Sequence, residues 1–281
     1  MKNTYILLLV SAAFFAADFL YPADKYFGDT SAVFTSNTAW FSDEARTERT
    51  TPPTSGEDTA IFYKTKGEAS YAPTAWITQI DTYVGNIVSA GESPINLGKQ
   101  LLNQSVPANF QVYGKLSAQI CDESGTMSFG TSFENYEGSA AVELVFGEIE
   151  VGAQVYGGRT YDSYKTASLY FNYLDSRISS SLVTVNGDVK IGGCAAEGVN
   201  SAAIMNIGAD KMKVSGIMKF ERNGWGYSNV IMHKASVLEL GGLAATNTNG
   251  NFTIANGTGG SFASEIVFKN AAGTDCQYIG S

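Results

Sequence analysis

The chain of 281 residues is poor in the residue types on which much enzymatic and metal chemistry depends. It has one histidine, His233, and three widely spaced cysteines, Cys121, Cys194 and Cys276, none in a Cys-x-x-Cys pair. Zinc sites of the cysteine and histidine type, redox motifs and histidine-dependent triads are therefore excluded everywhere except at His233. We interpret His233 as an ordinary strand or loop residue and predict no metal and no cofactor. We expect buried free thiols, although a disulfide stays open because the spacing of the cysteines selects no partners.

Charge is also scarce, and basic charge more than acidic. Only 16% of the residues are charged, and 18 Lys and Arg against 27 Asp and Glu give a formal net charge of −9. Nucleic-acid binding depends on clustered basic residues, so we predict no nucleic-acid partner. Aromatic residues and glycine are plentiful, with 15 Tyr, 16 Phe and 30 Gly, and this composition favours strands and turns.

One run of hydrophobic residues stands at the N-terminus. Residues 5–17 are almost entirely apolar, follow Lys2 and end before Asp18. The run is too short to span a bilayer comfortably and matches a signal peptide, which we place at residues 1–17 without a fixed cleavage point. The mature chain is then exported to the cell surface or the extracellular space and carries no transmembrane segment.

Short blocks of alternating apolar and polar residues, punctuated by glycine, cover most of the chain. They are clearest at residues 183–193, 212–220, 237–242 and 252–257. A period of two places alternate side chains on one buried face, and we expect the glycines to supply positive φ angles where the chain turns. The one helix expected is at Ser93–Leu102, where a serine precedes a proline.

The blocks share no fixed period, which favours an irregular stack of strands over a strict short repeat. We predict an all-β fold, a single elongated right-handed parallel β-helix (solenoid) over residues 18–281, with residues 26–82 as its N-terminal capping region. The alternative is an antiparallel β-sandwich, in which Asn186-Gly187 and Asn256-Gly257 form hairpin turns.

Several charged groups could belong to an active site, and each has a simpler interpretation. Residues 42–51 alternate in charge beside Pro-Pro, which is typical of a solvated, self-paired excursion. Glu148 and Glu150 share one strand face, as a glycosidase pair would, but they also occupy the polar positions of an alternating strand. The best set for a lyase comprises Asp188, Lys190, Asp210, Lys211 and Lys213. We expect all of these groups to be solvated and assign no catalytic residue.

A cluster of tyrosines offers a ligand platform instead. Exposed aromatic rings can stack on sugar rings or on a protein partner. The predicted platform consists of Tyr156, Tyr161, Tyr164, Tyr170 and Tyr173.

Three sequence elements resemble a known family when taken together. They are Ala39-Trp40, Pro52-Pro53 and residues 56–62, which lead into strands ending in Gly-Gly at 192–193 and 241–242. Over about residues 33–260 the chain resembles the passenger regions of autotransporter-like and autotransporter-associated β-strand-repeat surface proteins of Gram-negative bacteria. It departs from their pattern where Glu57 separates Gly56 from Asp58. The resemblance implies export, a β-solenoid and a role at the cell surface, often adhesion.

The predicted function is that of a secreted or surface-displayed, non-catalytic module that is adhesin-like or structural and meets a glycan or protein at the cell surface. The alternative is a carbohydrate-active parallel β-helix enzyme, either a polysaccharide lyase or a glycoside hydrolase. An autotransporter passenger is followed by a membrane-embedded translocator, for which these residues leave no room. We therefore expect a truncated passenger, another release route, or a likeness that reflects only shared strand stacking.

Overall fold

A computed structural model describes residues 23–28, 31–53, 55–63, 74–77, 82–90, 92–97, 109–120, 124–131, 138–155, 165–192, 201–221, 227–246, 251–257 and 262–269. These residues form strands, turns and bends and contain no helix, so the predicted all-β fold is confirmed for them. The strands belong to a 12-stranded sheet, here called sheet A, and an 8-stranded sheet, here called sheet B.

The strands of sheet A are β1 (Asp24–Phe27), β3 (Trp40–Phe41), β4 (Thr59–Tyr63), β6 (Thr82–Val84), β7 (Asn86–Ala90), β9 (Asn109–Ile120), β11 (Ala140–Val155), β13 (Ile178–Val185), β14 (Val189–Gly192), β16 (Lys211–Glu221), β18 (Val237–Thr246) and β20 (Glu265–Phe268). The strands of sheet B are β2 (Ser31–Val33), β5 (Thr74–Ile77), β8 (Glu92–Leu97), β10 (Gly125–Thr131), β12 (Lys165–Asn172), β15 (Ser201–Ile207), β17 (Tyr227–Met232) and β19 (Asn251–Asn256).

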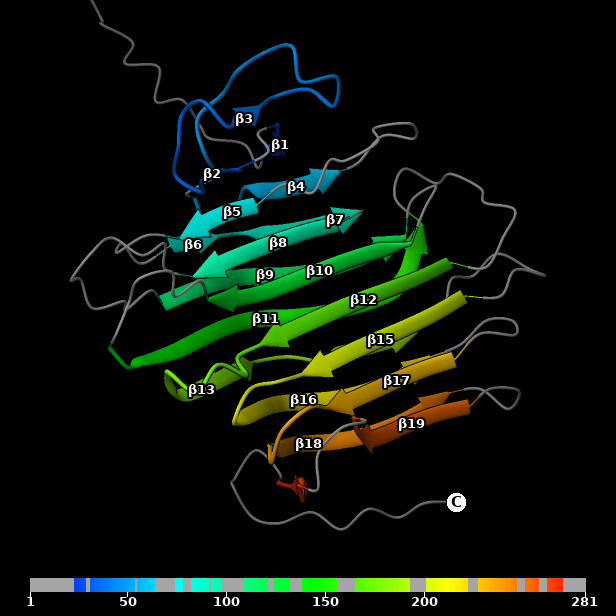
Figure 1. The fold of residues 1–281 in the computed structure, drawn as a ribbon. Helices are drawn as coiled ribbons and strands as arrows, with labels where there is room; N and C mark the ends of the chain where they lie inside the picture. The colour runs from blue at the N-terminus through cyan, green and yellow to red at the C-terminus, as the bar shows by residue number, and fades with distance from the viewer. Residues whose placement is uncertain are drawn as a thin grey trace, which may run out of the picture.

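From β4 onward the chain passes alternately through sheet A and sheet B, and we call one passage through both sheets a tier. The tiers follow one another down the stack in chain order (Figure 1). Among the described strands, β1 and β3 pair antiparallel and every other strand pair is parallel. This arrangement is compatible with the predicted β-helix.

Parallel pairing in register turns the alternation of the sequence into buried columns. In sheet A, Leu144, Val183, Met212 and Leu238 are successive register partners, and each is 0% exposed. The rings of Phe110 and Phe146 from sheet A meet those of Phe129 and Phe171 from sheet B, with Phe129 centroids 5.9, 5.5 and 5.8 Å from Phe110, Phe146 and Phe171. The two sheets therefore share one hydrophobic core, in which a fully buried aliphatic or aromatic side chain contributes about 1.5–3 kcal/mol.

A column of glycines marks a corner within sheet A. At each of these glycines, either the register of strand pairing shifts or one strand of sheet A ends and the next begins. The positions are Gly85, Gly114, Gly147, Gly187, Gly216 and Gly241. A Cβ on Gly147 would lie 2.3 Å from the Tyr113 carbonyl oxygen of the preceding tier, and the backbone N–H of Gly187 donates to the Gly147 carbonyl at 2.7 Å. The corner glycines are needed for close approach between tiers. The expectation of positive φ is wrong here, because Gly152 (φ 75°) is the one described glycine with a positive φ.

The first strands lie at one end of the stack (Figure 1). The ring of Trp40 contacts Phe27, Phe34 and Phe62 at centroid distances of 5.1, 5.1 and 5.7 Å, and its indole N–H donates to the Phe34 carbonyl at 2.6 Å. Beneath them the Lys25 ammonium lies 2.9 Å from the Asp58 carboxylate, with both side chains buried.

Two charged side chains of the excursion at 42–51 have partners close by in the chain. The Asp43 carboxylate accepts hydrogen bonds from the backbone N–H groups of Glu48 (2.7 Å) and Thr47 (2.9 Å), which lower its pKa. The Arg49 guanidinium lies 5.1 Å from the centre of the Phe41 ring.

Two sequence-based expectations are wrong. The helix expected at Ser93–Leu102 is strand β8 as far as Leu97, paired in parallel with β5 and β10. The antiparallel sandwich required a hairpin at Asn186-Gly187, yet the strands on either side of that dipeptide both pair in parallel with β11. Residues 1–17 lie outside the described residues.

Candidate functional site

A shallow groove of about 270 Å³ lies on the outer face of sheet A, beyond the glycine corner. It is lined by Lys115 on β9, Glu148, Ile149 and Glu150 on β11, Asp188 before β14, Lys190 on β14, and Lys219 and Glu221 on β16. Strand register places Lys115 beside Glu148, and Glu150 beside Lys190. The alternation that buries the aliphatic columns therefore gathers the charged residues on the opposite, outer face.

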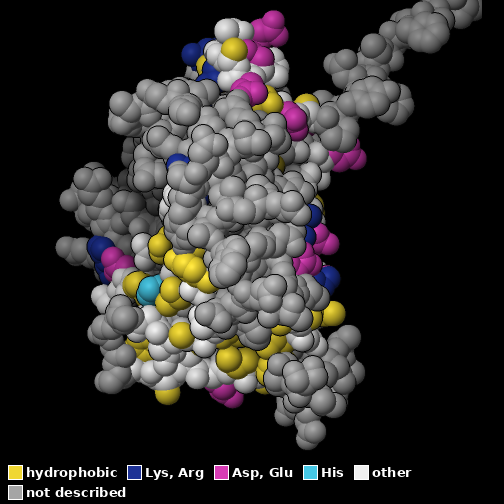
Figure 2. All heavy atoms as spheres, turned by 90° about the vertical axis from the view of Figure 1, so that its right-hand side faces the viewer, with side chains coloured by type: hydrophobic (Ala, Val, Ile, Leu, Met, Phe, Trp, Pro, Cys, Tyr) yellow, Lys and Arg dark blue, Asp and Glu magenta, His cyan; other side chains and the backbone are white. Residues whose placement is uncertain are grey.

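Each ionic side chain of the groove pairs with an opposite charge. Glu150, only 5% exposed, lies 3.2 Å from the Lys115 ammonium and 3.6 Å from that of Lys190. Lys190 also lies 2.8 Å from Glu221, and Glu148 lies 3.7 Å from Lys115. Acidic and basic side chains are accordingly mixed along the margin of the molecule that belongs to sheet A (Figure 2).

The remaining pair joins Lys219 to Asp188 across neighbouring strands. The backbone N–H of Ile217 donates to the Asp188 carboxylate at 2.8 Å, and together with Lys219 it lowers the pKa of Asp188. The hydrogen bond from Lys190 to Glu221 raises the pKa of Lys190. Both shifts favour the charged forms, whereas a general acid needs a raised carboxyl pKa and a lysine base needs a lowered one. The groove is chemically suited to holding polar groups.

Two tyrosines lie on the other side of the glycine corner from the groove. Tyr83 on β6 and Tyr113 on β9 are 38% and 51% exposed, and their rings stack with centroids 5.9 Å apart and an interplanar angle of 19°. Tyr113 occupies an outward position of β9, as Lys115 does at the edge of the groove. Its ring leans over Gly56, where an added Cβ would lie 3.0 Å from Cδ2 of Tyr113.

Of the tyrosine platform predicted from the sequence, the structure describes Tyr170 and Tyr173. Tyr156, Tyr161 and Tyr164 lie outside the described residues. Tyr170 is 36% exposed on β12 of sheet B, whereas Tyr173 is 1% exposed and belongs to the core. The hydroxyl of Tyr173 has no hydrogen-bond partner among the described residues, and burial raises its pKa well above the usual value. A buried ring cannot stack on a ligand, so Tyr173 does not belong to an exposed platform.

The charged residues weighed for catalysis do not form one site. Glu148 and Glu150 do share the groove, together with Asp188 and Lys190. Lys211 instead pairs with Glu239 at 2.8 Å, and Lys213 is exposed. The set considered for a lyase is thus divided between the groove and other parts of the surface.

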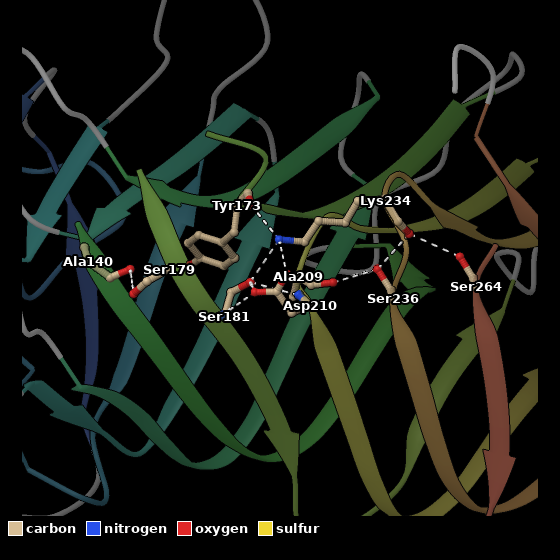
Figure 3. A network of polar contacts seen from close by, with 9 residues as sticks. All are labelled: Ala140, Tyr173, Ser179, Ser181, Ala209, Asp210, Lys234, Ser236 and Ser264. Carbon is tan, nitrogen blue, oxygen red and sulfur yellow. Dashed lines mark hydrogen bonds and ion pairs between the residues drawn. The ribbon is translucent and has the colours of Figure 1, made fainter. Parts of the chain in front are cut away.

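Asp210, the last member of that set, belongs to a network at the turns from sheet B to sheet A (Figure 3). The Lys234 ammonium lies 2.7 Å from the Asp210 carboxylate and donates to the Tyr173 carbonyl at 3.0 Å. The Asp210 carboxylate also accepts from the backbone N–H and the hydroxyl of Ser181 at 2.7 and 2.8 Å. These contacts join the turns of three successive tiers, which is a structural role.

Two further sequence-based expectations concern metals and membrane segments. The described residues hold no group of three or more His, Cys, Asp or Glu side chains that could bind a metal ion. His233 shares a hydrogen bond of 2.9 Å with the Asn206 side chain, while the three cysteines fall outside the described residues. The part of the chain that the structure describes has no helix long and apolar enough for a membrane span.

Comparison with protein-family models, curated proteins and solved structures returned no match for this chain.

Proposed function

We propose that this chain is a secreted or surface-displayed, non-catalytic β-solenoid that acts as an adhesin-like or structural display module. The succession of parallel tiers supports the solenoid, because each strand of one sheet connects through the other sheet to its own parallel neighbour. Crossover connections between parallel strands are right-handed in nearly all known proteins, so we propose a right-handed winding.

The observation that carries the non-catalytic proposal is the pairing of every ionic side chain that lines the groove. Groups held in ion pairs across tiers form a fixed surface of nearly balanced charge. Such a surface on a stack of rigid strands is suited to presenting a long face to a partner. Proton transfer would require one of these groups to give up its partner and change its charge.

Export is supported by the signal-peptide pattern of residues 1–17 and by the resemblance to autotransporter-like passenger regions. The test is to express the full chain in a Gram-negative host, fractionate the cells and determine the N-terminus by mass spectrometry. We expect a chain that has lost about the first 17 residues, outside the inner membrane. A chain with an intact N-terminus, confined to the cytoplasm, would contradict export.

A second candidate function is that of a carbohydrate-active enzyme, favoured by the presence of Glu148 and Glu150 in one groove with lysines. The purified chain is incubated with neutral and acidic polysaccharides, and new reducing ends and unsaturated uronates are measured. We expect no product. Product that disappears in the Glu148→Gln or Glu150→Gln variant would replace the display proposal with the enzyme.

A further inference from the structure

We propose that Tyr83 and Tyr113, with the adjacent groove, form a binding site for a neutral oligosaccharide. This inference rests on the proposed display function and names the ligand class for it. It places the ligand site on sheet A, whereas Tyr170 of the predicted platform lies on sheet B.

The two rings are exposed, although the core of this fold contains many aromatic side chains. Nine of the ten largest fully buried side chains in the described part of the chain are aromatic, namely seven phenylalanines, Trp40 and Tyr173. Tyr113, in contrast, is 51% exposed. Tyrosine supplies a large, flat contact area with few rotatable bonds, so binding to it loses little conformational entropy. An exposed stacked pair is therefore a prepared surface for a ligand with a flat apolar face.

The backbone beneath the rings is held rigidly. Gly114, directly after Tyr113, donates its backbone N–H to the Gly85 carbonyl at 2.7 Å, and Lys115 donates its own to the Asn86 side chain at 2.9 Å. Gly56 leaves the space over which the Tyr113 ring lies. Because the corner fixes both strands, the rings keep their place relative to Lys115 and the groove.

The groove supplies the polar half of the site. Three ammonium groups are hydrogen-bond donors, and four carboxylates are acceptors. Sugar hydroxyls both donate and accept, so they fit such a lining. The groove crosses from β9 to β16, three strand spacings of about 4.8 Å each, which suits an oligosaccharide better than a single sugar.

Charge decides between ligand classes. Every ammonium and carboxylate group of the groove is held in an ion pair, so a charged polysaccharide would have to break ion pairs to bind. A cationic ligand would likewise find each carboxylate of the groove already paired with a lysine, and nucleobases would bring phosphates to a chain of net charge −9. A neutral sugar avoids each of these costs.

The experiment measures binding of the full exported chain to two sets of probes. The neutral set is cello-, xylo-, manno- and galacto-oligosaccharides with laminarin and dextran, and the acidic set is polygalacturonate, alginate and hyaluronate. We expect binding to at least one neutral probe, with an affinity that changes little between about 50 and 500 mM NaCl because no net charge is neutralised. Binding confined to the acidic set, or no binding to either set, would overturn the inference.

Variants locate the site. We expect Tyr83→Ala and Tyr113→Ala each to weaken binding of the neutral probe about tenfold, and Tyr113→Phe to retain it, because the ring face makes the contact. Tyr170→Ala is the matched control, since Tyr170 is a partly exposed strand tyrosine on the other sheet. Unchanged thermal midpoints establish that the variants fold. Loss of binding in Tyr170→Ala but not in Tyr113→Ala would return the platform to sheet B and refute the inference.

Failure of this inference and failure of the proposed function have different signatures. An exported chain that binds a protein or acidic glycan equally well with Tyr113→Ala keeps the display function and loses this site. Release of product from a polysaccharide removes the non-catalytic function, whatever the tyrosine variants do.

Discussion

Adjacent glycines in β18 provide a sharp test of the glycine corner. Gly241 and Gly242 are both partly exposed, and neither has a positive φ. A Cβ on Gly241 would lie 2.3 Å from the Ser215 carbonyl oxygen and 2.7 Å from that of Gly216. A Cβ on Gly242 would meet only the Ile217 side chain, at 3.3 Å. The two alanine substitutions therefore differ in what they touch, backbone in one case and a flexible side chain in the other.

The expected cost of Gly241→Ala follows from these distances. The Ser215 oxygen must retreat by roughly 1.1 Å to reach an ordinary contact of about 3.4 Å, an overpacking of the kind that costs about 1–3 kcal/mol. That shift also stretches the neighbouring backbone hydrogen bonds, each worth about 0.5–1.5 kcal/mol. Alanine returns about 0.4–1 kcal/mol by restricting the unfolded chain. We expect Gly241→Ala to lower the free energy of unfolding by about 2–4 kcal/mol, and Gly242→Ala to change it by less than about 1 kcal/mol.

Urea unfolding followed by far-UV circular dichroism measures the global effect. Hydrogen exchange of the amides of β16 and β18 measures the local one, which matters because repeat structures can unfold in parts. Equal destabilisation by the two substitutions, or a larger effect of Gly242→Ala, would refute the close-approach explanation of the corner.

Three further predictions concern the cap, the core and acid stability. Asp58→Ala leaves the buried Lys25 ammonium without its carboxylate partner and should lower the free energy of unfolding in urea by about 3–5 kcal/mol. The double variant Lys25→Met, Asp58→Leu should recover much of this loss, and a double variant as unstable as the single one would contradict the prediction. Phe129→Ala should cost about 3–5 kcal/mol by opening a cavity between the sheets, and a loss below about 1 kcal/mol would mean that the rings are not packed as described. The Arg177 side chain lowers the pKa of Asp175 to about 2, so the stabilisation is present above about pH 4 and is lost as the pH falls through about 2. The thermal midpoint of the wild type should therefore fall more steeply than that of Asp175→Asn between about pH 5 and 2, and parallel curves would exclude the contribution.

Alternation in the sequence was sufficient to predict strands and an all-β fold. The buried columns through Val183 and Met212 are the apolar positions of the blocks recognised in the sequence. The role of the glycines was not predictable from the sequence, because a turn with positive φ and a close approach between two backbones both require glycine. The two roles are distinguished only by the position of the neighbouring tier. Pro94 was misleading for a similar reason, since a serine before proline occurs at helix starts and also in β8.

The candidate site was less predictable than the fold. Glu150 and Glu239 occupy polar positions of alternating strands, yet they are only 5% and 8% exposed because lysines of neighbouring tiers lie against them. Tyr83 and Tyr113 were not predicted as a ligand site, because the predicted platform lies where tyrosines are most closely spaced in the sequence. The signal in the sequence was a tyrosine at a position where the alternating pattern expects a polar residue. Whether two such tyrosines meet depends on the strand register, which the sequence does not supply.

The register has a consequence for how such a molecule can change in length. Val183 and Met212 are partners 29 positions apart, and Met212 and Leu238 are partners 26 apart, so these strands pair with the tier before and the tier after. Duplicating residues 183–211 would insert a unit whose two edges both match strands already present. Each insertion would move the two ends apart by about 4.8 Å without rebuilding any existing contact away from the junction. Gene duplication could in this way adjust the length of the molecule one tier at a time.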